Sequence, residues 1–404
     1  MNRRRPLKSV AGEAILKLQL HVEWLSSFVD LFELQVPESD ANAFFLRLRS
    51  EPCYESTRAL MTRLFANLPN PDGHFVREFQ TQGFDARIWE LYLFALREDG
   101  LWSIDRPMPS PDYRFSRGQH HVWVEAVIAS STQRLHEPDN PDHFPEFIDH
   151  ALAIRFGTPL ANKLAKRYWE LPHVAGQPLV IAIADFVESN VVRWGEQGLR
   201  RYLYGADYVM TSHPGEELAG RVIDVSEHRY GAKSIPSGFF SFDAAENISA
   251  VLFNNSGTVA KFHRKAFDPA MDRTYRLLRH GLCPDPRPES PLPQPFAYIV
   301  GEVEESWREG TVLLHNPNAR YPIEHSFFEG TTQWWFKDGD FNVDVAEFHP
   351  FNSETTIFSA GGEVDEDFTR VLDALAEKVV ERMQMTPEDL AKTYDRHRKI
   401  LESE

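Results

Sequence analysis

Three of the carboxylates between residues 84 and 129 are the side chains of this chain best suited to do chemistry. Glu90 stands in an apolar, helix-like stretch, Asp112 follows a proline, and Glu125 stands in the middle of a strand-like run. An acid in apolar surroundings is destabilising unless a cation or hydrogen-bond donors stabilise its charge. We therefore expect each of the three to have such a partner, either a metal ion or a group of the protein.

The first acid lies in the segment GFDARIWELYLFALRED, whose apolar side chains cover most of a helix circumference. A helix that is apolar nearly all round is buried. Glu90 would then lie in the interior, with Arg87 one turn away. One interpretation is a structural ion pair between these two residues. The other is that Glu90 belongs to a site with the acids that follow it.

The next two acids lie in PMPSPDYRFSRGQHHVWVEAVIAS, which predicts a β-hairpin with strands at DYRF and HVWVEAVIA and a tight turn at RGQ. Side chains alternate along a strand, so Glu125 should share one face with Trp123, Val127 and Ala129. Asp112 begins the first strand and is expected near Glu125 across the ladder. Two acids that converge from adjacent strands form an oxygen-rich pocket suited to Mg²⁺ or Mn²⁺.

These elements resemble the PD-(D/E)XK, or restriction-endonuclease-like, nuclease superfamily. In that family a helix carries a glutamate, and a hairpin follows with Pro-Asp at the start of one strand and Glu-x-Lys on the next. The matching segments are RIWELYL, SPDYRF and VWVEAV, within residues 79–190. The resemblance implies a metal held by Asp112 and Glu125 with Glu90 assisting, and a water activated for attack on a phosphodiester bond.

The chain departs from the family pattern at the lysine, because that position holds Val127 and the signature reads Glu-x-Val. Some members supply the lysine from a neighbouring helix, and IRFGTPLANKLAKRYWEL offers Lys163 and Lys166, which share one helix face. Either lysine could orient the attacking water or stabilise charge on the phosphate, and Lys163 is the first choice. The alternative for each is a solvated lysine on an amphipathic helix.

The elements that must position these residues predict an α/β (α+β) fold. A helix, the hairpin, a second helix, the buried strand QPLVIAIADF and the helix NVVRWGEQGLRRYLYG follow one another. This order agrees with a restriction-endonuclease-like core in which helices flank a central mixed sheet. We predict an N-terminal helical region at 1–72, the nuclease-like core at 73–210 with 247–253 as a candidate late strand, a β-rich C-terminal region at 211–365 and C-terminal helices at 366–404.

The C-terminal region contains a second predicted hairpin, formed by ENISAVLF, the turn NNSG and TVAKFHRKAF. Lys261, His263 and Lys265 would then alternate onto one face. Such a strip of charge either follows a nucleic-acid backbone or protects an edge strand from aggregation, and the second interpretation is favoured. The six prolines of CPDPRPESPLPQPF predict a connector, with strands at FAYIVGEV and TVLLHNPNARYPI after it.

Composition limits the classes of partner. The chain has 404 residues and a net charge of −17. It contains no apolar run of membrane-spanning length and only two cysteines, Cys53 and Cys283. We therefore predict a cytoplasmic protein that does not enter a membrane and that has neither a disulfide framework nor a thiolate zinc site. Phosphate contacts favour a basic surface, so DNA would bind through a local basic face. The candidate patches are Arg155, Lys163, Lys166 and Arg167, and further along Arg193, Arg200 and Arg201. A homo-oligomer or protein partner would use the C-terminal region.

Other chemistry-bearing residues carry weaker signals. His136, His143 and His150 recur every seven residues in a proline-rich stretch, where solvated loop histidines are the default. His315 and Asn318 belong to HNPN, a turn former that needs no catalytic role. The chain lacks the motifs G-x-x-x-x-G-K-[ST], G-x-G-x-x-G, H-E-x-x-H and G-x-S-x-G, so nucleotide hydrolysis, dinucleotide redox, zincin and α/β-hydrolase functions lose their usual support.

The sequence therefore predicts a metal-dependent nuclease that hydrolyses DNA phosphodiester bonds in restriction, repair or defence. The alternative is a catalytically inactive nuclease-like fold that acts as a binding or regulatory module, which Val127 and the acidic composition favour. A third interpretation makes all three acids structural, with Glu90 paired to Arg87 and Glu125 paired to a basic residue from elsewhere in the chain.

Overall fold

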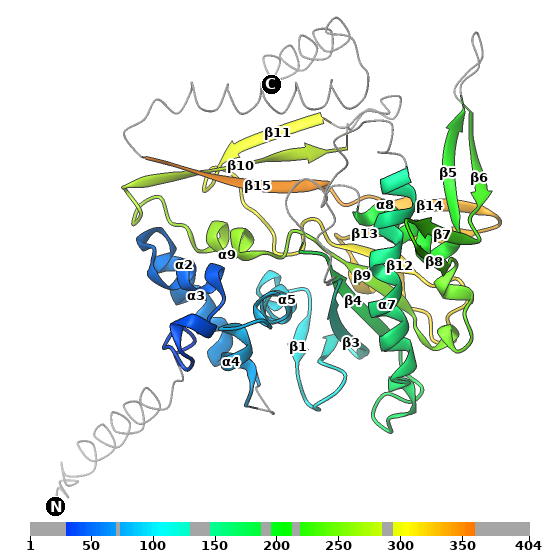
Figure 1. The fold of residues 1–404 in the computed structure, drawn as a ribbon, viewed down its shortest axis with the longest axis horizontal. Helices are drawn as coiled ribbons and strands as arrows, with labels where there is room; N and C mark the ends of the chain where they lie inside the picture. The colour runs from blue at the N-terminus through cyan, green and yellow to red at the C-terminus, as the bar shows by residue number, and fades with distance from the viewer. Residues whose placement is uncertain are drawn as a thin grey trace, which may run out of the picture.

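The computed structural model describes residues 30–69, 73–129, 146–186, 195–211, 219–284 and 294–359 (Figure 1). Its centre is a mixed sheet of eight strands. In order across the sheet these are β1 (Ser103–Asp105), β2 (Tyr113–Arg117), β3 (His120–Ile128), β4 (Leu179–Ala184), β9 (Ala250–Phe253), β12 (Val312–His315), β13 (Thr332–Lys337) and β14 (Asp340–Asp344). The predicted α/β class, with helices around a large mixed sheet, is confirmed.

The hairpin that carries Asp112 and Glu125, and the buried strand beside it, form as the sequence predicts, whereas the short strand β1 was not predicted. Strands β1, β2 and β3 pair antiparallel, and β3 then runs parallel to β4. The hairpin closes at Arg117 and His120, and Gly118 in its turn has a φ of 60°, a conformation that glycine adopts without strain. All six residues of β4 are buried, which confirms the central strand predicted from its unbroken apolar run.

Helices cover both faces of the sheet, and residues along β3 alternate between the two cores. Val122 and Val124 pack in one core, and Trp123 and Val127 pack in the other. On the first side lie α2 (Ala43–Ser50), α3 (Glu55–Ala66), α4 (Phe75–Phe79), α5 (Phe84–Ala95) and α9 (Val259–Ala266), and on the second lie α7 (Leu152–Ala165) and α8 (Gly195–Tyr204). In Figure 1 the blue helices stand on one side of the sheet, and α7 and α8 on the other.

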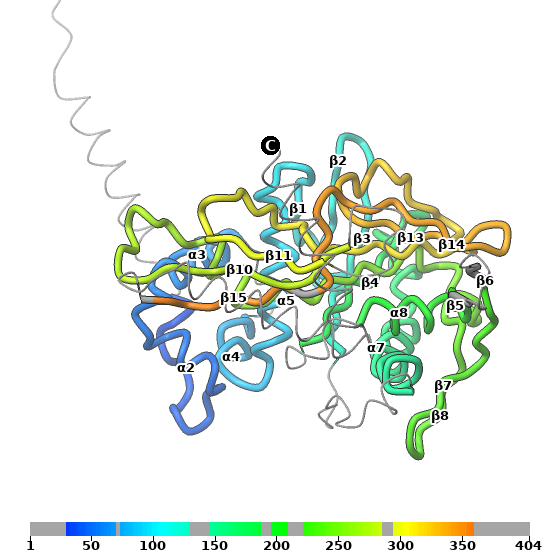
Figure 2. Tube along the Cα trace, turned by 90° about the horizontal axis from the view of Figure 1, so that it is seen from above, coloured from blue at the N-terminus to red at the C-terminus, as the bar shows by residue number. Residues whose placement is uncertain are grey.

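A second, smaller sheet lies beside the first, and it is seen across the molecule in Figure 2. It contains β10 (Tyr275–Cys283), β11 (Gln294–Ile299) and β15 (Asn352–Ser359) in the order β11-β10-β15. Two-stranded ribbons pair β5 (Ala206–Thr211) with β6 (Ala219–Asp224) and β7 (Glu227–Tyr230) with β8 (Lys233–Pro236). The short helical turns are Glu38–Asp40, Pro52–Tyr54, Leu96–Asp99, Phe147–Ala151, Tyr168–Glu170, Phe239–Ser241, Ala245–Asn247 and His325–Phe328.

The predicted hairpin at residues 246–267 is wrong in its second half, because the chain after β9 forms the helix α9. Apolar residues recur at helical spacing there, at Val259, Phe262 and Ala266, and they outweigh the alternating charges that suggested a strand. Lys261 and His263 are buried inside the helix packing and not displayed on an edge. Strand β9 itself belongs to the eight-stranded sheet, between β4 and β12.

Several predictions concern residues outside the described ranges, among them most of the first predicted helix, His136, His143 and the C-terminal helices at 366–404. Within the described ranges, residues 31–33 form a turn in place of the end of that first helix. Strands from both sides of the predicted boundary at residue 210 lie in one sheet. No helix of the described residues is long and apolar enough to cross a membrane.

Candidate active site

Asp112 and Glu125 are held against each other by the backbone of the β2–β3 hairpin. The register pairs Tyr113 with Val124, which places Asp112 opposite Glu125 at the open end of the ladder. The backbone N–H of Asp112 donates to Oε2 of Glu125 at 3.2 Å, and the N–H of Ala126 donates to Oδ2 of Asp112 at 2.9 Å. The predicted meeting of these two acids across the hairpin is therefore present, and the strand amides fix how each carboxylate is turned.

Glu90 joins them from helix α5 through an arginine. Both of its carboxylate oxygens accept hydrogen bonds from Arg87, one turn away, so the ion pair expected from the sequence is present. Arg106 reaches in from the loop after β1, with Nη1 3.2 Å from Oε2 of Glu90 and Nη2 2.9 Å from Oδ1 of Asp112. One guanidinium thus links the helix acid to the hairpin acid.

A lysine and a tyrosine from the other face of the sheet complete the group. Lys163 of α7 donates to Oε1 of Glu125, and the hydroxyl of Tyr168 donates to the same oxygen at 2.7 Å. Lys166, in contrast, is exposed just beyond the end of α7 and makes no ion pair with the three acids among the described contacts. The structure therefore brings together Glu90, Asp112, Glu125 and Lys163, and leaves Lys166 at the surface.

The electrostatics of the group are unbalanced at Asp112. Its pKa is raised to about 7, first by burial and then by the neighbouring charges of Glu125 and Glu90, and Arg106 lowers it only in part. Burial also raises the pKa of Glu90 in spite of its two arginines. A carboxyl whose charged form is this costly is a candidate functional group, because a further cation would stabilise it.

The donor set fits a hard cation in its chemistry, since carboxylate oxygens are the ligands that Mg²⁺ and Mn²⁺ prefer. Asp112, Glu125 and Glu90 are the residues that could hold such an ion. In the folded arrangement, however, both oxygens of Asp112 and both of Glu125 already accept hydrogen bonds from the protein. Correspondingly, no three histidine, cysteine or carboxylate side chains of the described residues form a ready metal-binding set.

Two members of the group were missed by the sequence reasoning. Arg106 lies in IDRPMPS, between two predicted elements, where nothing in the spacing indicates which way its side chain turns. Tyr168 follows Lys163 by five residues, beyond the end of the helix, so helical periodicity does not predict that the two meet at one oxygen. Val127, where the resemblance implied a lysine, packs against the same core as α7, from which Lys163 comes.

The basic patches expected to face DNA are largely used inside the fold. Arg155 is bound to Asp185 with both side chains under one-tenth exposed. Arg201 pairs with Asp149 and Asp207, and Arg200 also approaches Asp207. These three arginines do not form a surface patch, because acids that the local sequence does not reveal bind them. Arg193 lies outside the described residues, and Arg167 is exposed and paired with Glu170.

The remaining sequence candidates have structural environments. His150 lies in a helical turn against His228. His315 is buried, stacked on His325 and bonded to Gln333. Asn318 belongs to the predicted turn, where its backbone N–H donates to Oδ1 of Asn316.

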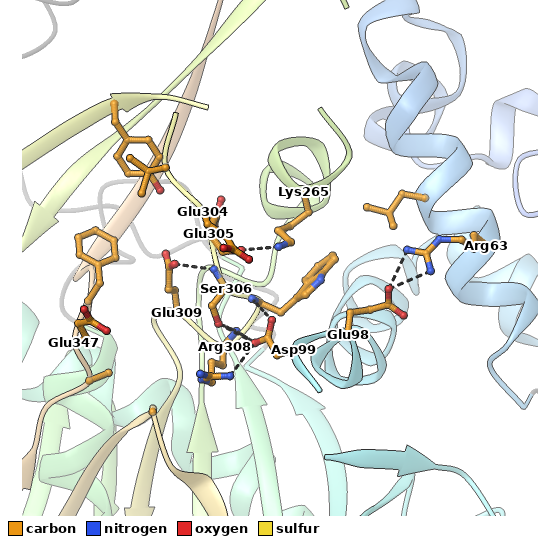
Figure 3. A pocket seen from close by; sticks show the side chains of 17 residues that line it. Arg63, Glu98, Asp99, Lys265, Glu304, Glu305, Ser306, Arg308, Glu309 and Glu347 are labelled. Carbon is orange, nitrogen blue, oxygen red and sulfur yellow. Dashed lines mark hydrogen bonds and ion pairs between the residues drawn. The ribbon is translucent and has the colours of Figure 1, made fainter. Parts of the chain in front are cut away.

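A cavity of about 950 Å³ lies elsewhere, between α3, α9 and the loop 303–309 (Figure 3). Acids line it, but several are engaged by the protein itself. Asp99 accepts from the backbone of Trp307 and Arg308, and Glu98 pairs with Arg63. None of the predicted site residues lines this cavity.

No family model, curated protein or solved structure matches the chain.

Proposed function

We propose that this chain is a metal-dependent nuclease with a restriction-endonuclease-like core, and that it hydrolyses DNA phosphodiester bonds. The observation that supports the proposal most is the meeting of four side chains predicted for that chemistry. Acids from helix α5 and from the hairpin lie in one network, and Lys163 reaches the hairpin acid from α7. Lysine, aspartate and glutamate come from separate segments of the chain, which a single local structural motif does not explain.

The order of elements also supports the proposal. Helix α5, the antiparallel strands β1 to β3, helix α7, the parallel strand β4 and helix α8 follow one another along the chain. This is the order of helix, hairpin, helix, buried strand and helix that the resemblance implies. Helices α5 and α7 contribute to opposite cores of the sheet, as flanking helices must.

Each residue of the group has a defined part in this proposal. Asp112 and Glu125 would hold Mg²⁺ or Mn²⁺ with Glu90 assisting, and the ion would supply charge neutralisation at the phosphate and a more acidic water. Lys163 and Tyr168 orient Oε1 of Glu125 from one side. The Lys163 ammonium takes the place of the family's lysine and stabilises negative charge on the phosphate.

DNA would approach at the end of α7. Lys166 is exposed there, next to the half-buried Lys163 and to Arg167, whose charge is paired with Glu170, so the basic surface is small and local on an otherwise acidic protein. A metal at the acids would add to this positive charge. The net charge of −17 then favours discrimination against nonspecific binding over high affinity.

The test is cleavage of plasmid and single-stranded DNA in Mg²⁺ or Mn²⁺ by the wild type and by Asp112→Ala. We expect the variant to lose activity by roughly 100-fold or more, since it lacks an acid proposed to hold the ion. Asp105→Ala is the matched control, because Asp105 is a hairpin-side aspartate paired to Arg114 outside the group. Equal cleavage by wild type and Asp112→Ala, with both folded by circular dichroism, contradicts the proposal.

A second candidate is an inactive nuclease-like module, and the pairing of every Asp112 and Glu125 oxygen favours it. Such a module would bind DNA or a protein without hydrolysis. Calorimetric titration of Mn²⁺ into wild type and Asp112→Asn separates the two. Heat that disappears in the variant supports the nuclease, and its absence in both supports the module.

A further inference from the structure

Arg106 occupies the position between two of the proposed metal ligands. Its side chain is 5% exposed, and its two terminal nitrogens contact different acids, Glu90 and Asp112. Its Nε is buried and has no hydrogen-bond partner among the described residues, and the guanidinium lies 5.9 Å from the centre of the Tyr113 ring. Arginine binds a carboxylate most strongly when two of its N–H groups donate to the two oxygens of the same acid. Arg106 instead makes one bond to each of two acids, so both contacts are weaker than that arrangement.

We propose that Arg106 is a displaceable internal cation, which neutralises the acids in the metal-free protein and must leave Asp112 before a divalent ion can bind. The inference rests on the proposed function, and it adds how the same site is kept closed. Arg106 would compete with the ion for Oδ1 of Asp112. Its removal should therefore strengthen metal binding, although it adds no ligand.

The other two cations of the group do not bond to Asp112 among the described contacts. Arg87 bonds to Glu90 and Glu78, and Lys163 bonds to Glu125. Among the described contacts, Arg106 is the one cation bonded to Asp112, whose second oxygen is held by the strand amide of Ala126. Displacing Arg106 therefore frees Oδ1 of Asp112 without disturbing the hairpin.

The displaced guanidinium has a chemically suitable new partner in a phosphate of the substrate. Arginine binds phosphate oxygens with two parallel N–H···O bonds, a better geometry than its divided contact with Glu90 and Asp112. DNA that draws Arg106 away would then open the acids to the ion. Metal binding should accordingly be weak alone and stronger with a phosphodiester present, and this dependence should weaken once Arg106 is replaced.

The experiment is a calorimetric titration of Mn²⁺ into the wild-type chain, Arg106→Gln and Arg114→Gln. Arg114 is a matched control, since it pairs with an aspartate of the same hairpin region but bonds to none of the three acids among the described contacts. We expect Arg106→Gln to bind Mn²⁺ about tenfold more tightly than wild type, since one competing charge is gone, and Arg114→Gln to be unchanged. Equal affinities in Arg106→Gln and Arg114→Gln overturn the inference.

Asp112→Asn distinguishes this failure from failure of the proposed function. If wild type binds Mn²⁺ through Asp112 but Arg106→Gln binds no more tightly, only the role of Arg106 is wrong. If no variant binds Mn²⁺ and none cleaves DNA, the metal site itself is wrong.

Arg106→Gln removes a counter-ion from buried acids and could destabilise the fold, so a second measurement tests the inference through stability. Thermal unfolding of Arg106→Gln and Arg106→Lys is followed with and without Mn²⁺. The inference predicts that the ion raises the Tm of Arg106→Gln more than that of wild type, with the lysine variant between them. Equal shifts in the three proteins overturn it.

Discussion

Two groups of charges in this molecule are both buried, but they differ in how well the charge of the central acid is stabilised. The first group, here the candidate-site network, places three acids among three cations, namely Glu90, Asp112 and Glu125 with Arg87, Arg106 and Lys163. The second group, here the Glu305 cluster, places three cations around one central acid, namely Lys261, Arg264 and Arg279 around Glu305, and Arg279 also binds Glu309.

The difference appears in the pKa of the central acid. Burial acts to raise the pKa of Asp112 and of Glu305 alike. Around Asp112 the neighbouring acids raise it further, whereas around Glu305 the three cations outweigh burial and hold the pKa well below its usual range. The charged form of Glu305 is thus well stabilised, and that of Asp112 is not. In the Glu305 cluster the cost falls on a cation, since burial lowers the pKa of Lys261 to about 8. An added cation can stabilise a buried carboxylate such as Asp112, and carboxyl groups whose pKa is raised in this way are typical of functional sites.

The Glu305 cluster has a structural role that follows from its position. It joins helix α9, strand β10 and the loop 303–309 beside the cavity of Figure 3, in which the ammonium of Lys265 also donates to the Glu305 carbonyl oxygen. The side chains of Lys261 and Arg279 are fully buried. Charges this deep depend on one another, because water does not screen them.

Removing the central acid of the Glu305 cluster is the largest expected effect. Glu305→Gln leaves buried cations without their main counter-ion, and we expect it to lower the free energy of unfolding by about 3–5 kcal/mol. The measurement is urea denaturation followed by circular dichroism. Glu304→Gln is the control, since Glu304 is the preceding residue and is exposed, and it should change stability by less than about 0.5 kcal/mol. Equal losses in the two variants contradict the comparison.

The sequence predicted the first group much better than the second, and the reason is that the elements carrying its acids were predicted correctly. The hairpin acids lie in segments whose periodicity indicates the element and the face, so the meeting of Asp112 and Glu125 could be predicted, and the family resemblance implied that Glu90 and Lys163 join them. The Glu305 cluster connects residues up to 44 positions apart across three elements, and its helix was predicted as a strand. Alternating charge in KFHRK suggested an edge strand, although Val259 and Phe262 carried the helical spacing.

Side chains from loops marked the limit of prediction within the site as well. Arg106 comes from a proline-rich connection, and its direction depends on the two acids that it meets only after folding. Likewise, Arg155 looked like a free surface charge until the fold brought it to Asp185. Which acid binds which arginine is decided by tertiary packing, which local spacing does not record.

The next effect in size is the pH dependence of stability that comes from the candidate-site network. In protein treated with EDTA, Asp112 keeps its proton up to about pH 7 when folded but loses it near pH 3.8 when unfolded. The folded state therefore binds more protons between these values, and wild-type stability falls as the pH rises through them. Asp112→Asn has no carboxyl group to titrate and does not lose stability in this way. The free energy of unfolding of the variant, relative to that of wild type, should therefore rise by about 2 kcal/mol between pH 4.5 and pH 7.5, which is less than the full difference between the two pKa values allows.

Thermal and urea unfolding across that pH range measure the difference. The Glu305 cluster provides the comparison of opposite sign, since the lowered pKa of Glu305 makes its stabilisation fall as the pH drops below about 4.5. The difference in stability between Asp112→Asn and wild type could instead stay constant, or decline, as the pH rises. Either result would show that the charged form of Asp112 is as well stabilised as that of Glu305.

The smallest expected effect separates the two lysines at the end of α7. Lys163 is 22% exposed and bonds to Glu125, which also keeps its bonds from Tyr168 and the Asp112 amide. Lys163→Met should therefore cost only about 1 kcal/mol of stability in urea unfolding, and Lys166→Met less than about 0.5 kcal/mol.

In DNA cleavage the effect of Lys163 should be large, because Lys163 is proposed to stabilise charge on the phosphate and its loss should slow cleavage by roughly 100-fold. A lysine that matters little for folding and much for turnover belongs to a functional site. Equal cleavage by the two lysine variants would instead place Lys163 with the structural charges of the Glu305 cluster.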